Sequence, residues 1–140
     1  MRYLLDTNVI CEWMKPEPAA GVTAWLNINK AEDLYLSVIS FAELRRGVDR
    51  LAEGERRRRL DRWVREELPA WFEGRVPLVT LEAADAWGEL VAASEARGRR
   101  IGVMDGFLAA IAFTQGMTLV TRNVGDFSGV GIAMFCPWEA

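Results

Sequence analysis

Four acidic residues lie where apolar segments end or helical patterns begin, and carboxylates in such places can bind metal ions or transfer protons. One follows the apolar triplet Tyr3–Leu5 directly, and another follows the segment Thr118–Thr121 by a few residues. In open parallel sheets, ligands bind beyond the carboxyl ends of the strands. The other two interrupt a mostly apolar stretch and begin the most apolar helical pattern of the chain. The four candidates are Asp6, Glu43, Asp105 and Asp126.

Each candidate also has an ordinary structural interpretation. Ser40 followed by Glu43 is the spacing of a helix capping box. Asp105 in a first helical turn interacts favourably with the helix dipole. Asp6 is a suitable N-cap for a following helix, and Asp126 is a suitable turn residue. Taken one at a time, these acids therefore do not require a function.

Taken together, the four carboxylates would be costly to bring close. Two such charges 4 Å apart repel by about 4 kcal/mol at an effective dielectric constant near 20, and folding would then raise their pKa values unless a cation lay between them. A site made only of oxygen ligands selects hard cations, chiefly Mg²⁺ or Mn²⁺. Such ions commonly act on phosphate groups. Sequence spacing alone leaves the convergence of these acids open.

The composition excludes several other chemistries. The 140 residues include no histidine, which removes Ser-His-Asp and Cys-His catalysts and any zinc site that needs imidazole. Hydrophobic residues make up 51% and charged residues 26%, as in a soluble globular protein. The net charge of −3 argues against a protein that coats nucleic acid by overall charge.

That net charge averages a basic middle and two acidic flanks. Residues 45–65 hold nine arginines against four acidic residues, a local charge of +5, while residues 1–44 sum to −3 and residues 66–140 to −5. The i,i+4 pairs Glu53/Arg57, Glu55/Arg59 and Asp61/Arg65 predict a solvated helix face for most of these arginines. A basic ridge that attracts phosphates is the alternative for the others.

Short apolar segments alternate with helical patterns along the chain. We expect one α/β domain over residues 1–140: a three-layer α/β/α sandwich around a mainly parallel sheet of about five strands. The longest helical patterns run from Glu82 to Arg97, before Gly98, and from Asp105 to Gln115, before Gly116. The expected strands are Tyr3–Leu5, Leu34–Val38, Val76–Leu81, Thr118–Thr121 and Ile132–Phe135.

Nothing in the sequence indicates a targeting or membrane segment. Asp105 interrupts the apolar stretch that comes nearest to a spanning helix. Cys11 and Cys136 are too few for a disulfide framework, so we expect reduced core thiols in a cytoplasmic protein, with a single bridge between them as the alternative.

The sequence resembles the PIN-domain ribonucleases, and specifically the VapC/FitB-type toxins of bacterial toxin–antitoxin modules. The resemblance rests on four ordered blocks and a terminal strand that together cover essentially the whole chain. They are Tyr3-Leu4-Leu5-Asp6-Thr7-Asn8, Ser40-Phe41-Ala42-Glu43-Leu44-Arg45-Arg46-Gly47, Ile101-Gly102-Val103-Met104-Asp105-Gly106-Phe107-Leu108-Ala109-Ala110, Leu119-Val120-Thr121-Arg122-Asn123-Val124-Gly125-Asp126-Phe127 and Phe135-Cys136-Pro137-Trp138.

The resemblance implies a single PIN domain and a role for each block. Asp6, Glu43 and Asp105 would be the acidic site residues. Relatives differ over the fourth acid: some carry it where this chain has Asn123, others at Asp126, which we favour. Thr7, Asn8 and Thr121, with Asn123, would orient carboxylates and water.

The implied activity is cleavage of RNA phosphodiesters that depends on one or two Mg²⁺ or Mn²⁺ ions and leaves 5′-phosphate and 3′-hydroxyl ends. The resemblance also implies inhibition by a cognate antitoxin, a homodimer within a toxin–antitoxin complex, and DNA contact only through the antitoxin. Aromatic residues in the first half could serve these contacts or the core; they are Trp13, Trp25, Phe41, Trp63 and Trp71. The alternatives are a catalytically weak PIN-domain binding module in an antitoxin and DNA regulatory complex, and a metal-dependent nuclease that acts on DNA.

Overall fold

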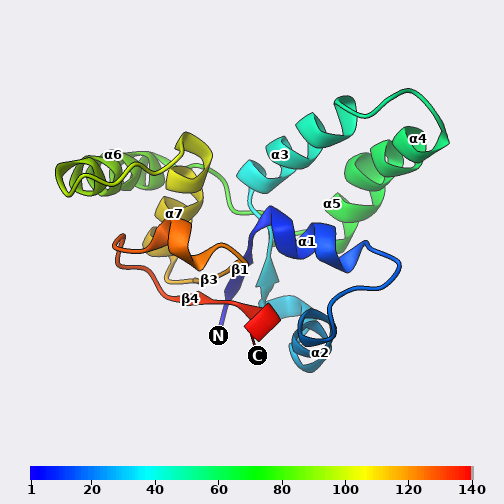
Figure 1. The fold of residues 1–140 in the computed structure, drawn as a ribbon, viewed down its shortest axis with the longest axis horizontal. Coiled ribbons are helices and arrows are strands. Elements are labelled where there is room, and N and C mark those ends of the chain that lie inside the picture. Colours follow the sequence, from blue (N-terminus) through cyan, green and yellow to red (C-terminus); the bar gives the residue numbers. More distant parts are fainter. Residues whose placement is uncertain (140) are drawn as a thin grey trace.

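Four short parallel strands form the centre of the computed structural model, which describes residues 1–139. The sheet order is β2-β1-β3-β4, so that β1 and β3 are the inner strands (Figure 1). Tyr3 lies opposite both Leu34 and Thr118 in this register. The strands are β1 (Tyr3–Leu5), β2 (Leu34–Tyr35), β3 (Thr118–Val120) and β4 (Met134–Phe135).

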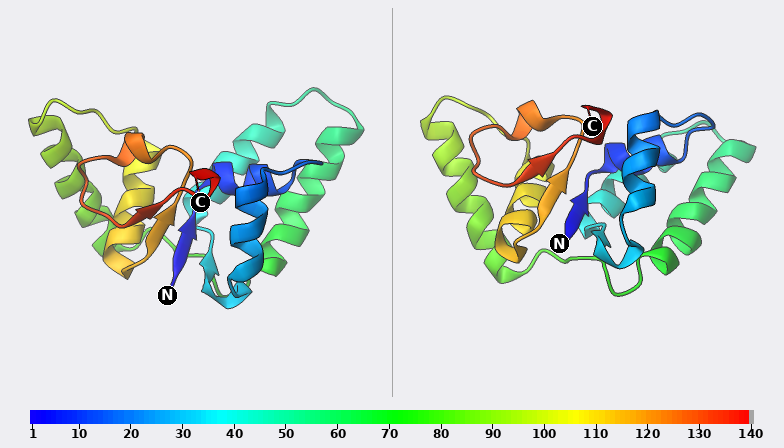
Figure 2. Two further views of the ribbon diagram at one scale, coloured as in Figure 1. Left: turned by 60° about the horizontal axis from the view of Figure 1, so that its bottom comes forward. Right: turned by 90° about the horizontal axis from the view of Figure 1, so that it is seen from below.

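Helices cover the two faces of the sheet as two separate groups, which Figure 2 shows as wings on either side of the strands. The first group comprises α1 (Thr7–Trp13), α2 (Ala20–Ile28), α3 (Val38–Asp49), α4 (Glu55–Arg62) and α5 (Leu68–Trp71). The second comprises α6 (Leu81–Ala96) and α7 (Val103–Gln115). Short turns complete the described part of the chain: η1 (Ala31–Asp33), η2 (Trp63–Glu67), η3 (Val124–Phe127) and η4 (Pro137–Glu139).

The alternation of side chains along the inner strands creates two cores. Leu5 and Val120 point into a cluster with residues of the first helix group. Leu4 and Leu119 point into a second cluster with α6, α7 and Phe127. Because both faces of each inner strand are covered, the last two residues of each strand are buried and apolar: Leu4 and Leu5 in β1, Leu119 and Val120 in β3. The three-layer α/β/α prediction is confirmed, although the sheet has four strands where we expected about five.

The expected strand Val76–Leu81 is wrong. This segment runs beside β2 without pairing fully: the amides of Leu36 and Val38 donate to the carbonyls of Arg75 and Pro77, at 3.1 Å each. A complete parallel ladder would need a return bond from the amide of residue 77, and proline has no N–H to give. The segment therefore stays an extended loop along the sheet edge.

The expected strand Leu34–Val38 is too long, because α3 begins at Val38. Its N-cap is Ser37, whose hydroxyl accepts a hydrogen bond from the Ser40 amide. Ser40 therefore lies inside the helix, and the capping-box interpretation of Glu43 is wrong. The two long helices agree with prediction to within two residues at each end, and Gly116 ends α7 in the left-handed conformation (φ 64°).

The arginine-rich segment forms the end of α3 and the whole of α4. Only one of the three expected i,i+4 ion pairs is present within residues 1–139, that between Asp61 and Arg65 at 3.1 Å. Arg45 instead reaches from α3 to both Asp49 and Asp61, at 2.6 Å each, and so joins α3 to α4.

The chain continues from α4 into α5 through η2, which is a π-helical turn. Four residues spaced every four positions pack toward the first core: Leu60, Val64, Leu68 and Phe72. A regular α-helix has 3.6 residues per turn, so a spacing of four drifts by about 40° at every step. The wider π turn absorbs part of this drift and keeps the four side chains on one side.

Within residues 1–139 no helix has the length and apolar character needed to span a bilayer. Both cysteines are free thiols, so the alternative of a bridge between Cys11 and Cys136 is wrong. Cys11 is also exposed, contrary to the expectation of a core position.

Helices α6 and α7 pack through a glycine. A Cβ atom on Gly106 would lie 2.7 Å from Nε1 of Trp87 and 3.1 Å from Cγ2 of Val91. The same indole donates a hydrogen bond to the Val103 carbonyl (3.2 Å) and stacks on Phe107 at 5.1 Å. Trp87 thus fixes the first turn of α7, which carries Asp105.

We expect Gly106→Ala to lower the free energy of unfolding by about 1–3 kcal/mol, because the added methyl must push α6 away from α7. Chemical denaturation followed by circular dichroism measures this change. The matched control is Gly88→Ala in α6, where nothing lies within 4 Å of the added Cβ. This variant should be stabilised by about 0.5–1 kcal/mol through helix propensity. Equal effects of the two substitutions would contradict the close-packing argument.

Candidate functional site

Asp6 stands at the carboxyl end of β1 and is nearly buried, with 7% of its surface exposed. It is the N-cap of α1, as one structural interpretation of this residue predicted: Oδ1 accepts from the Thr7 amide at 2.7 Å. Oδ2 accepts from the Thr121 hydroxyl at 2.8 Å and from the Asn8 amide group at 3.4 Å. The backbone of Asp6 also donates to the Val120 carbonyl. The carboxylate therefore links the ends of β1 and β3.

Glu43 reaches the same place from α3. Its Oε1 accepts a hydrogen bond from the Thr7 hydroxyl at 2.9 Å. Because the Thr7 amide already binds Asp6, this one threonine spans the two carboxylates. Glu43 is half-buried and has no ion pair among the described residues.

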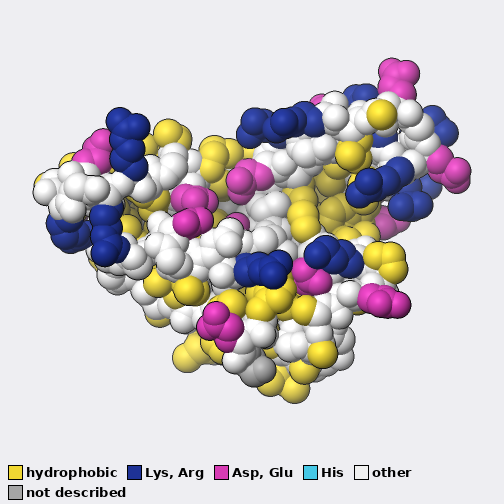
Figure 3. All heavy atoms as spheres, viewed as in Figure 1, with side chains coloured by type: hydrophobic (Ala, Val, Ile, Leu, Met, Phe, Trp, Pro, Cys, Tyr) yellow, Lys and Arg dark blue, Asp and Glu magenta, His cyan; other side chains and the backbone are white. Residues whose placement is uncertain are grey.

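Asp105 and Asp126 complete the acidic edge from the other side of the sheet. Asp105 lies in the first turn of α7 and Asp126 in the 3₁₀ turn after β3. The charges of Asp6, Glu43 and Asp126 all raise the pKa of Asp105, so the structure brings the four predicted acids within electrostatic reach of one another. Acidic side chains gather near the middle of the face seen in Figure 3.

The pKa values of three of the acids are raised, which shows that their ionised forms are destabilised in the fold. Burial, together with the charges of Asp6, Glu43 and Asp126, raises the pKa of Asp105 to about 6. Burial also raises the pKa of Asp6, although hydrogen bonds from Thr121 and Thr7 oppose it. Burial is again the largest cause of the raised pKa of Glu43. The site holds more negative charge than its own protein groups neutralise.

This donor set fits a hard cation better than any other group. All its ligands would be carboxylate oxygens, and a divalent ion would relieve the repulsion that raises their pKa values. As the side chains stand, no three acidic or cysteine residues among residues 1–139 are close enough to hold an ion. Ion binding would therefore require the carboxylates to move closer together.

The predicted supporting residues lie at the same edge. Thr121 is fully buried, and its hydroxyl accepts hydrogen bonds from Asn8 (3.3 Å) and from the Asn123 amide (3.1 Å) while it donates to Asp6. Asn8 also accepts from the Arg122 amide at 3.3 Å. Thr7, Asn8 and Thr121 thus orient carboxylates, whereas Asn123 contributes its backbone to this network and is itself exposed.

Sequence reasoning missed two neighbours of the acids. The charge of Arg46 lowers the pKa of Glu43, and its position three residues later on α3 was the available signal. Although Cys11 is an exposed residue, the protein atoms around its sulfur raise the pKa of the thiol by desolvation, and the nearby charges of Glu43 and Asp6 raise it further. Only the packing of α1 against α3 reveals this second neighbour.

A groove of about 620 Å³ leads away from the acidic edge. Thr7 and Glu43 line one part of it, and Arg56 and Arg59 of α4 line another. Apolar side chains supply most of the remaining lining; they are Met14, Leu44, Val48, Leu51, Leu60 and Trp63. Figure 3 shows hydrophobic atoms in the hollow between the arm of α3 and α4 and the body of the molecule.

A parallel α/β/α fold with four acids at the carboxyl edge of its sheet is the arrangement expected above for a PIN domain. The comparisons with known proteins identify the same family. The PIN domain family model matches residues 3–132. The chain belongs to the PIN-domain family. It is 40% identical to the plasmid stability protein StbB of Pseudomonas syringae, and this match covers 98% of the chain and 99% of the relative.

Two further relatives are named as toxins or ribonucleases. The chain is 38% identical to VapC ribonuclease Y4jK of Sinorhizobium fredii, with 97% of each protein covered. It is 36% identical to toxin FitB of Neisseria gonorrhoeae, covering 97% of this chain and 98% of FitB.

Solved structures show the same fold. The crystal structure of FitAcB from Neisseria gonorrhoeae matches with a TM-score of 0.92 and 36% identity, over 99% of both chains. The DNA-bound VapBC structure from Salmonella typhimurium matches with a TM-score of 0.79 and 26% identity, over 98% of both chains. The resemblance stated from the sequence is therefore confirmed.

The raised pKa of Asp105 predicts a pH-dependent effect on stability. The folded protein binds this proton more tightly than the unfolded chain, so without metal its stability falls as the pH rises from about 4 to about 6. At pH 8 in EDTA, Asp105→Asn should raise stability by about 1–2 kcal/mol, after allowance for solvent screening, or the melting temperature by roughly 3–8 °C. Near pH 4 the gain should vanish.

Thermal unfolding at the two pH values checks this prediction, with the exposed Asp85→Asn of α6 as a control that should change little. Mg²⁺ should raise the melting temperature of the wild type more than that of Asp105→Asn. An equal gain at both pH values would show that the variant acts through packing and not through charge.

Proposed function

We propose that this chain is a Mg²⁺- or Mn²⁺-dependent endoribonuclease toxin of a toxin–antitoxin module, with residues 1–140 as a single PIN domain. The observation that carries the proposal is the group of carboxylates at the carboxyl edge of the sheet, which the protein's own cations leave largely uncompensated. Membership of the PIN-domain family supports it, as do relatives named VapC ribonuclease and toxin FitB.

Asp6, Glu43, Asp105 and Asp126 would hold one or two divalent ions. When bound, these ions would supply charge neutralisation for the phosphate and a lowered pKa for water. Asp126, which is exposed, is favoured over Asn123 as the fourth ligand because its charge already acts on Asp6 and Asp105. Thr7 would keep Asp6 and Glu43 at a fixed separation through its amide and hydroxyl.

The proposed reaction is hydrolysis by in-line attack. Water adds its oxygen to the phosphorus, one carboxylate accepts the water proton, and the P–O3′ bond breaks. The expelled 3′ oxygen takes up a proton, so the products carry 5′-phosphate and 3′-hydroxyl ends. Glu43 and Asp105 are only partly buried, which leaves them accessible to a substrate, whereas Asp6 is enclosed by its hydrogen bonds.

We expect the wild type to cleave tRNA, rRNA or mRNA with Mg²⁺ or Mn²⁺, and EDTA to abolish the cleavage. Asp6→Asn should reduce the rate by at least about a hundredfold, because it removes a charge from the acidic edge. Gel analysis of labelled RNA, with ligation to identify 5′-phosphate ends, measures this. Asp85→Asn serves as the control and should keep full activity. Absence of cleavage by the antitoxin-free wild type would favour the catalytically weak binding module, and preference for DNA would favour a DNA nuclease.

We further propose that the groove beside Glu43 receives a segment of the cognate antitoxin. Its apolar lining suits a peptide, and its two charged regions suit a segment with a basic side chain at the acidic edge and an acidic side chain at Arg56 and Arg59. Several relatives were solved as complexes described as FitAB or VapBC, some of them with DNA. DNA would reach this chain only through the antitoxin.

The groove generates a separate prediction. Met14 is 45% exposed and lines the groove, so Met14→Glu should weaken antitoxin binding by about tenfold or more without loss of RNA cleavage. Calorimetric titration of each purified variant with separately purified antitoxin measures the affinity of the antitoxin for that variant. The control is Ile28→Glu, at an exposed position outside the groove. If both variants bind the antitoxin as well as the wild type, the antitoxin uses another surface.

A homodimer is also part of the proposal. Large apolar side chains are exposed on α6, on α7 and in the segment that precedes α6; they are Leu78, Leu81, Val103 and Phe113. Exposed apolar surface of this kind marks protein interaction sites. A second copy of the chain is the occupant that we propose for it.

A further inference from the structure

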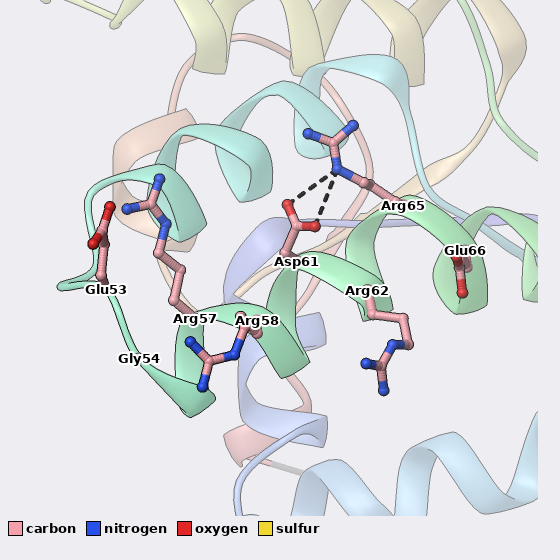
Figure 4. A pocket seen from close by; sticks show the side chains of 8 residues that line it. All are labelled: Glu53, Gly54, Arg57, Arg58, Asp61, Arg62, Arg65 and Glu66. Carbon is pink, nitrogen blue, oxygen red and sulfur yellow. Dashed lines mark hydrogen bonds and ion pairs between the residues drawn. The ribbon is translucent and has the colours of Figure 1, made fainter.

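Helix α4 separates two different concave surfaces. Its Arg56, Arg59 and Leu60 face the apolar groove beside Glu43. Its Arg57, Arg58 and Arg62 line a second depression of about 520 Å³, which shares no lining residue with that groove. Figure 4 shows this second surface from close by.

Every side chain that lines the second depression is charged. Besides the arginines of α4, the lining comprises Glu53, Gly54, Asp61, Arg65 and Glu66. Protein interfaces are depleted of charged residues at their centre and need apolar anchors. This surface offers no such anchor, whereas guanidinium groups are suited to phosphate through bidentate hydrogen bonds.

Most of the arginines between positions 45 and 65 form no ion pair among the described residues. Asp61 accepts from both Arg45 and Arg65, so its charge is already committed. Six arginines between positions 45 and 65 form no ion pair within residues 1–139; they are Arg46, Arg50, Arg56, Arg58, Arg59 and Arg62. In Figure 4, Arg58 and Arg62 extend away from the Asp61–Arg65 pair.

These arginines lie on a projecting arm. Figure 3 shows Lys and Arg side chains over α3 and α4, with acidic side chains among them at the tip of the arm; further basic side chains lie over α6 and beside the central acids. A polyanionic substrate is repelled by those acids until a cation neutralises them. A basic surface outside the acidic edge can bind the same substrate without that repulsion.

We propose that the outer face of α4, centred on Arg58 and Arg62, binds the phosphate backbone of the RNA substrate away from the cleavage site. This inference rests on the proposed ribonuclease function and adds a second contact to it. Because the two depressions are separate, RNA binds the outer face even while the antitoxin fills the apolar groove.

The test compares two variants of equal net charge. Arg58→Gln with Arg62→Gln removes the proposed contacts. Lys30→Gln with Arg100→Gln removes the same charge at two exposed positions elsewhere. Fluorescence anisotropy with a labelled single-stranded RNA of about 20 nucleotides, in EDTA to prevent cleavage, gives affinity as a function of salt.

The outer-face variant should bind this RNA roughly tenfold more weakly than the control at low salt. Its slope of log affinity against log salt should be shallower by about 0.7–1.4, since each lost single-strand phosphate contact contributes about 0.7. Wild-type protein saturated with antitoxin should keep measurable, salt-dependent RNA binding.

Equal affinity and slope in the two variants would overturn the inference. It would also fail if the outer-face variant lost antitoxin affinity with RNA binding unchanged, because the surface would then belong to a protein partner. Failure of the proposed function is distinguishable. If the wild type binds RNA through Arg58 and Arg62 but never cleaves it, only the nuclease proposal is contradicted. If the wild type cleaves RNA and the outer-face variant binds RNA normally, only this inference is contradicted.

Discussion

The carboxylate of Asp6 is the contact on which the sheet edge depends. It is a nearly buried charge, and such a charge is tolerated only when hydrogen bonds replace the lost water. The donors are the Thr7 amide, the Thr121 hydroxyl and the Asn8 side chain. They come from the first helix and from the end of β3, so satisfying one carboxylate fixes how these elements meet.

The other acids are arranged around this fixed point, and their position opposes folding. Glu43 is tied to it through Thr7, while Asp105 is held by the packing of Trp87 over Gly106. The fold brings negative charges together by binding each one to a different rigid element, so none can move far from the others. This arrangement costs stability, and the proposed divalent cation would recover part of it by neutralising the carboxylates.

Much of this could be predicted from the sequence, and the failures have definite causes. Short apolar segments and helical spacing were sufficient for the inner strands and for α6 and α7, because burial on both faces leaves a plain apolar pattern. Val76–Leu81 has strand composition, but Pro77 removes the donor that pairing needs. Ser37 and Ser40 are both plausible caps by type, and only the path of the chain after β2 selects the first. Sequence spacing also does not show that four acids spread over 121 positions share one edge of the sheet. Their convergence could be inferred only from the family resemblance or seen in the folded structure.

The π-helical turn between α4 and α5 has a consequence for the phase of the helix before it. Each residue turns an α-helix by about 100°, so the loss or gain of one residue in that turn would rotate α4 by that angle while Leu68 and Phe72 stayed in the core. Arg56 and Arg59 would then leave the apolar groove, and a different set of arginines would face it. The assignment of charges to the two sides of α4 is therefore set by the length of a segment that contributes only Trp63 to the groove lining, and none of the groove's arginines.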